Sequence, residues 1–98
     1  MKNQVNIAVQ VLPKSKTKET YALVDDAIEV IRNSGLKYRV CPFETVIEGP
    51  YDEIMKTVEI LQQKCFENGA EELLVYLKIQ NKKDSAVTIE DKMAKYDK

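Results

Sequence analysis

The sequence predicts an α+β domain in which a four-stranded antiparallel sheet carries two helices on one face. Two observations lead to this prediction. Segments with apolar residues at every second position, typical of half-buried strands, alternate with segments whose apolar residues lie three and four positions apart, typical of amphipathic helices. Their order is strand, helix, hairpin, helix, strand, which with right-handed crossovers gives the ferredoxin-like βαββαβ sandwich. With 98 residues the chain is expected to form a single domain, residues 1–98.

The first predicted strand covers residues 5–12 and turns one wholly aliphatic face toward the core. A polar loop follows, in which Ser15 and Thr17 are both candidates to cap the next helix. That helix is predicted over residues 18–34, and Gly35 supplies a left-handed stop. Its expected buried stripe consists of Tyr21, Val24, Ile28 and Ile31.

The centre of the chain is a predicted hairpin of two short strands, residues 37–41 and 44–48. Pro42 separates the strands because proline has no N–H to give to a strand ladder. The second helix begins after Gly49-Pro50, with two acidic residues in its first turn, where carboxylates meet the positive end of the helix dipole. Its expected buried stripe consists of Ile54, Val58, Leu61 and Cys65, and Asn68-Gly69 ends it.

The last predicted strand covers residues 72–80. After a polar loop, residues 88–95 are expected to form a short third helix with Thr88 as its cap. Since a helix of two turns is unstable alone in water, it must pack against the rest of the domain.

One face of the predicted sheet is left uncovered, because both helices pack on the aliphatic face. We call this surface the open face. Its mixture of apolar and hydrogen-bonding side chains suits self-association, which we expect, or a small-molecule site; an ordinary solvated sheet face is the third interpretation. The side chains expected there are Asn6, Ala8, Gln10, Arg39, Cys41, Glu44, Val46, Glu48, Leu74, Tyr76 and Lys78.

Charge and hydropathy argue against two classes of partner. The 16 acidic and 15 basic residues nearly cancel and are interleaved, so nucleic-acid binding is not expected. No apolar stretch approaches the roughly 20 residues of a membrane span, and residues 1–4 lack the pattern of a signal peptide. We therefore expect a cytoplasmic protein without membrane contact.

The residue types present also argue against catalysis. The chain contains no histidine, the commonest general base and the usual partner of a serine or cysteine nucleophile. Cys41 and Cys65 form no CxxC pair, so no metal is expected, and both thiols are expected to be reduced, with Cys65 in the core. We predict a protein that is not an enzyme and needs no cofactor; a small enzyme using Glu48 as acid or base remains a minor hypothesis.

The hairpin and its surroundings resemble a known family. Gly35-Leu36-Lys37-Tyr38 leads to Pro42, and Thr45-x-x-Glu48-Gly49 then precedes a helix, as in the small thiamine-binding protein family related to YkoF, formerly a domain of unknown function. Residues 88–93 look like that family's C-terminal segment. The resemblance implies the ferredoxin-like fold, assembly into dimers or tetramers, and non-catalytic binding of thiamine or its hydroxymethylpyrimidine part in the cytosol.

The resemblance assigns ligand binding first to Thr45 and Glu48. A carboxylate can accept hydrogen bonds from an aminopyrimidine or lie near the thiazolium charge, and a hydroxyl can complement ring nitrogens. Phe43, Ser34 and Tyr38 are further ligand-binding candidates, the two aromatic rings as stacking surfaces. Alternation places positions 45 and 48 on opposite sheet faces unless the strand is bulged. The alternative function is a regulatory or structural oligomerisation module without a small-molecule ligand.

Overall fold

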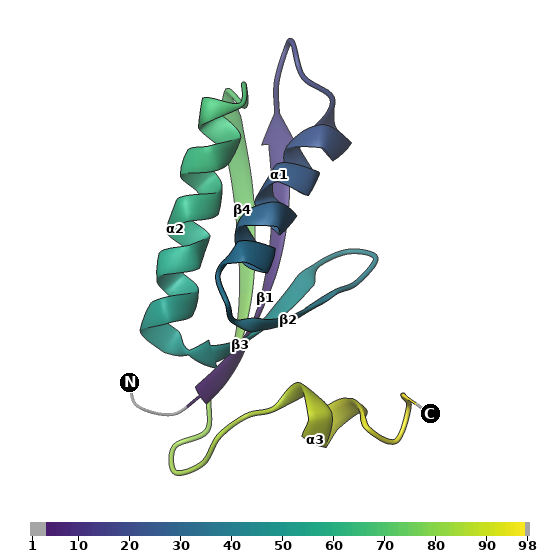
Figure 1. Cartoon of the computed structure of the whole chain (residues 1–98), viewed down its shortest axis with the longest axis vertical. Coiled ribbons are helices and arrows are strands. Elements are labelled where there is room, and N and C mark those ends of the chain that lie inside the picture. The colour runs from purple at the N-terminus through teal and green to yellow at the C-terminus, as the bar shows by residue number, and fades with distance from the viewer. Residues whose placement is uncertain (1–3, 98) are drawn as a thin grey trace.

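The computed structural model describes residues 4–97 and has the predicted α+β architecture, with α1 and α2 side by side on one face of a four-stranded sheet (Figure 1). The strands are β1 (Gln4–Lys14), β2 (Lys37–Val40), β3 (Thr45–Pro50) and β4 (Glu72–Gln80). The helices are α1 (Thr20–Asn33), α2 (Tyr51–Glu67) and the short α3 (Ile89–Met93).

The sheet is antiparallel throughout, with strand order β2-β3-β1-β4. The pairing of β1 with β3 runs without a break from Gln4 opposite Pro50 to Val9 opposite Thr45. β3 therefore contains no bulge along this ladder, and its side chains alternate strictly between the helix side and the open face.

The core lies between the helices and the aliphatic side of the sheet. The predicted α2 stripe of Ile54, Val58, Leu61 and Cys65 is buried in full. Burial also raises the pKa of the Cys65 thiol, so less of it is ionised at a given pH. The other core side chains come from β1, α1 and β3: Val5, Ile7, Val9, Leu23, Ala27, Ile31 and Ile47.

Two expectations for α1 are wrong. The buried stripe is Leu23, Ala27 and Ile31, whereas the predicted Tyr21 is 76% exposed. The helix begins after Glu19, and neither predicted residue caps it. Ser15 is held instead in the preceding loop: its hydroxyl donates to the Gly69 carbonyl (2.7 Å) and accepts the backbone N–H of Lys18 (3.1 Å).

The open face is only partly open. After β4 the chain turns back across the part of the open face that is lowest in Figure 1, and α3 lies in this part of the chain. We call residues 87–97 the C-terminal segment. Thr88 caps α3 as predicted, accepting a hydrogen bond from Asp91 N (3.1 Å), and Val87 and Ile89 are buried. The predicted third helix thus exists and packs on the sheet surface that the sequence left uncovered.

Candidate functional site

A small apolar pocket lies where α1 faces the β2–β3 hairpin. It has a volume of about 90 Å³. Val9 and Val11 of β1 and Val24 and Ile28 of α1 line it, together with residues 40–45 of the hairpin. We call it the hairpin pocket. Its lining is mainly apolar, so the polar side chains in it are candidate ligand contacts.

Thr45 is the main polar side chain of the hairpin pocket. It opens β3 opposite Val9 and Val40, and its side chain shares the helix side of the sheet with them. The residue is 5% exposed, and its hydroxyl has no hydrogen-bond partner in the part of the chain that the structure describes. A hydroxyl without a partner in the protein is free to donate to, or accept from, a bound molecule.

Phe43 lies at the mouth of the same pocket. The turn is closed by a hydrogen bond from Cys41 N to the Glu44 carbonyl (2.9 Å), which leaves the Phe43 side chain 82% exposed. Glu44 also lines the pocket, and its carboxylate lies 3.4 Å from the Lys78 ammonium on the open face. The structure thus brings two of the predicted site residues, Phe43 and Thr45, into one pocket.

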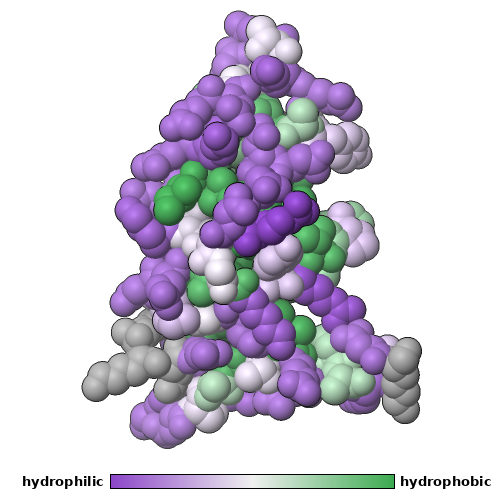
Figure 2. Space-filling model, viewed as in Figure 1, coloured by the Kyte–Doolittle hydropathy of each residue, from purple (hydrophilic) through white to green (hydrophobic). Residues whose placement is uncertain are grey.

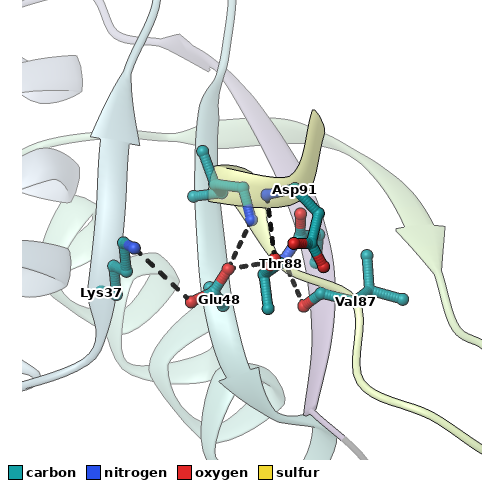
Figure 3. A network of polar contacts seen from close by, with 7 residues as sticks. Lys37, Glu48, Val87, Thr88 and Asp91 are labelled. Atoms are coloured by element: carbon teal, nitrogen blue, oxygen red, sulfur yellow. Dashed lines mark hydrogen bonds and ion pairs between the residues drawn. The ribbon is translucent and has the colours of Figure 1, made fainter. Parts of the chain in front are cut away.

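Glu48 lies on the opposite face of the sheet, as strict alternation from Thr45 requires. It is 8% exposed, and its Oε1 accepts hydrogen bonds from Ile89 N (2.6 Å) and Asn6 Nδ2 (3.4 Å). Its Oε2 lies 3.9 Å from Lys37 Nζ. Figure 3 shows Glu48 at the centre of this network, between Lys37 and the C-terminal segment. The carboxylate therefore binds the protein's own backbone at the start of α3.

Asn6 completes the network and was not foreseen as a site residue. It pairs in register with Glu48, is 3% exposed, and donates a second hydrogen bond to the Val87 carbonyl (3.2 Å). Its Oδ1 has no partner among residues 4–97. An amide between the aliphatic residues Val5 and Ile7 was the available signal, because such a residue needs polar neighbours when buried.

The remaining candidates, Ser34 and Tyr38, lie elsewhere. The Ser34 hydroxyl donates to the Ile31 carbonyl (2.6 Å) and accepts from Leu36 N (3.1 Å), so it serves the end of α1. It borders a groove of about 620 Å³ between α1 and α2. That face is mainly hydrophilic, with hydrophobic residues in small patches (Figure 2). Tyr38 is half-buried against the core and does not line the hairpin pocket.

The C-terminal segment is also tied to β2. Both terminal guanidinium nitrogens of Arg39, Nη1 and Nη2, donate to the Asp97 carboxylate, at 2.8 and 3.0 Å. The hydrogen bond, and then the charge of Asp97, raise the pKa of Arg39. Sequence reasoning placed Arg39 on the open face correctly but could not supply its partner, which lies 58 positions further along the chain.

Residues 4–97 contain neither a cluster of metal ligands nor a helix that could span a membrane. No three metal-ligating side chains of the His, Cys, Asp or Glu type gather there. None of the helices in this part of the chain has the length and apolarity to cross a membrane.

The fold and the hairpin pocket define a small ferredoxin-like domain with a pocket between one helix and the central hairpin. The chain belongs to the family of thiamine-binding proteins, whose model matches residues 7–97. Among its relatives, UPF0045 protein CPE1503 of Clostridium perfringens is 37% identical over 91 residues, which cover 93% of this chain and 95% of the relative.

Solved structures of relatives have the same fold. A domain of unknown function DUF77 from Bacillus cereus is 41% identical and superposes with a TM-score of 0.92, covering 96% of this chain and 90% of that one. TM0486 of Thermotoga maritima, described as a candidate thiamine biosynthesis or salvage protein, is 33% identical with a TM-score of 0.85, covering 95% and 98% of the two chains. These matches establish the fold class predicted from the sequence and the family that it resembles.

Proposed function

We propose that the protein binds thiamine, or its hydroxymethylpyrimidine part, in the hairpin pocket and does so without catalysing a reaction. The protein would serve salvage, trafficking or buffering of the vitamin in the cytosol. Membership of the thiamine-binding family supports this function. The observation that carries the choice of site is the hydroxyl of Thr45, a buried residue whose side chain has no hydrogen-bond partner within residues 4–97 and lines a mainly apolar pocket.

The lining of the pocket suits a flat heteroaromatic ring. Apolar side chains of β1 and α1 can cover the faces of a pyrimidine, while the Thr45 hydroxyl can complement a ring nitrogen or the amino group. The volume of about 90 Å³ is well below the roughly 300 Å³ at which sites for larger ligands begin. We propose that only one substituted ring enters and that the cationic thiazolium stays outside, near Phe43 and the Glu44 carboxylate.

The pocket offers little for catalysis. Cys41 and Glu44 are the titratable side chains among its lining residues, and Glu44 is paired with Lys78. The lining thus offers one thiol and one carboxylate that is already paired, and it includes no histidine, the commonest general acid or base. This supports binding as the function, and it gives no role in acid–base chemistry to Glu48, which lies on the other sheet face.

Calorimetry and thermal unfolding with thiamine and with hydroxymethylpyrimidine test the proposal. Both ligands are expected to raise the melting temperature, since a ligand at 100 times its Kd stabilises the folded state by about 2.7 kcal/mol. Thr45→Val keeps the side-chain shape and removes the hydroxyl, so it is expected to weaken binding about tenfold, the equivalent of one hydrogen bond.

Thr57→Val is the matched control, because Thr57 is equally buried and its hydroxyl only donates to the Glu53 carbonyl within α2. It is expected to bind like the wild type. Absence of heat and of any melting shift at millimolar ligand would remove the proposal. Equal affinities of the Thr45→Val and wild-type proteins would move the site away from the hairpin pocket.

We further propose that the protein is a homo-oligomer, a dimer or tetramer, that associates through the uncovered part of the open face. Leu12, Leu74 and Tyr76 are exposed there beside the Glu44–Lys78 ion pair. Such a surface, apolar with a self-complementary charge pair, fits a second copy of the chain. The same observation favours the second candidate function, an oligomerisation module without a small-molecule ligand.

A further inference from the structure

The C-terminal segment connects three strands of the sheet in turn. Val87 N donates to the Gln4 carbonyl of β1 (3.1 Å), and Ile89 N donates to Glu48 of β3 (2.6 Å). Asp97 then accepts both hydrogen bonds of Arg39 on β2. The segment therefore crosses the open face from the middle of the sheet to its edge, and its last attachment is to the edge strand.

The edge strand β2 contributes its last residue, Val40, to the lining of the hairpin pocket. It has four residues and a single hydrogen-bonded neighbour, β3. Its side chains alternate, so Arg39 points to the open face while the adjacent Val40 lines the pocket. Short edge strands are among the parts of a fold that open most readily. A restraint on Arg39 at the open face therefore also restrains Val40, its neighbour in the chain, which lines the hairpin pocket on the helix side.

We propose that Arg39 and Asp97 are positioning residues for the hairpin pocket, through which the C-terminal segment holds the β2–β3 hairpin in the conformation that binds ligand. The effect on ligand affinity rests on the proposed function. The effect on the order of the hairpin does not, and it can be measured in the ligand-free protein. The bidentate geometry fixes both the distance and the direction of β2 relative to the segment. Because both side chains are about half exposed, the pair contributes to local order far more than to global stability.

Four variants test the pair: Arg39→Ala, Asp97→Asn, the exchange Arg39→Asp with Asp97→Arg, and Arg32→Ala as control. Arg32 is a similarly exposed arginine in an ion pair with Glu29 (3.2 Å), but on α1. The first readout is amide hydrogen exchange of residues 38–46 in the ligand-free protein. The second is the Kd for thiamine or hydroxymethylpyrimidine, whichever binds more tightly to the wild type.

Each single variant is expected to speed exchange across the hairpin and to weaken binding about two- to fivefold, because a smaller fraction of the protein then has the binding-competent hairpin. The exchanged pair is expected to recover both properties, and Arg32→Ala to change neither. Global unfolding by urea serves as a check that all four variants are folded.

Unchanged hairpin exchange in Arg39→Ala and Asp97→Asn would overturn the inference, whatever the ligand result. If the wild type binds ligand, and the two variants show faster hairpin exchange but an unchanged Kd, then the pair does not act on the hairpin pocket and that part of the inference is wrong. If the wild type binds neither ligand, the proposed function fails by itself, and faster hairpin exchange would still support the restraint.

Discussion

Thr45 and Glu48 show how far the properties of single residues can be predicted. A spacing of three positions along a regular strand puts two side chains on opposite faces of the sheet. The register of β3 is unbroken, so Thr45 and Glu48 do lie on opposite faces. That Glu48 binds the backbone of Ile89 could not be predicted, because no sequence pattern fixes the path of residues 81–87. The sequence identifies a polar residue on a strand, while its partner is set by the tertiary fold.

Replacing Glu48 is expected to reduce stability more than replacing an exposed acidic residue. Glu48→Ala leaves Ile89 N without its acceptor in a buried place and leaves Asn6 Nδ2 with the Val87 carbonyl alone, at a cost of about 2–3 kcal/mol. Glu48→Gln keeps an acceptor oxygen and is expected to cost about 1 kcal/mol. Urea unfolding measures both values. An exposed control, Glu72→Ala, removes only the surface pair with Lys14 and is expected to change little.

At the scale of elements, the regular pattern of the sequence predicts most of the fold. The buried stripe of α2 and the span of β4 agree with the predictions. The stripe of α1 does not, because its apolar residues cover two adjacent faces: Leu23, Ala27 and Ile31 are buried, while Val24 and Ile28 are half-buried beside the hairpin pocket. Periodicity alone cannot decide which of two apolar faces meets the sheet. The second face was the available sign of a pocket beside α1.

The connection after α2 depends on Gly69. Its φ of +115° is one that L side chains rarely adopt, and an added Cβ would lie 2.8 Å from Lys18 Cγ in the loop before α1. Gly69→Ala is therefore expected to cost about 1–3 kcal/mol in urea unfolding. Gly35→Ala is the comparison, since Gly35 also has positive φ (+80°) but nothing within 4 Å of an added Cβ. Equal costs for the two variants would show that crowding at Lys18 has no effect.

The whole molecule has one sheet with two unlike surfaces. The helix side is filled by the core, and the open face is divided between the C-terminal segment and an exposed part that includes Leu74 and Tyr76. The sequence predicted the two surfaces through alternation. It did not predict that the C-terminal segment covers part of the open face, because no pattern in the sequence shows where the short third helix packs.

Association through the exposed part of the open face can be tested by one substitution that introduces a charge there. Leu74→Asp is expected to convert the oligomer to a folded monomer, since a carboxylate in an apolar contact is costly to desolvate. Ile60→Asp on α2 is the control, because Ile60 is 41% exposed against 42% for Leu74 but lies on the helix side. Light scattering at micromolar concentration gives the masses. A monomeric wild type, or a Leu74→Asp protein of unchanged mass, would contradict the proposed interface.

The path of the C-terminal segment also bears on the order in which the domain can be completed. Residues 87–97 follow all four strands in the chain, so a sheet that forms before they pack leaves Asn6 and Glu48 uncovered. At that stage these polar groups are hydrated, which discourages contact with other unfinished chains at a moment when exposed apolar surface favours aggregation. Packing of the segment then exchanges bound water for the backbone of Val87 and Ile89.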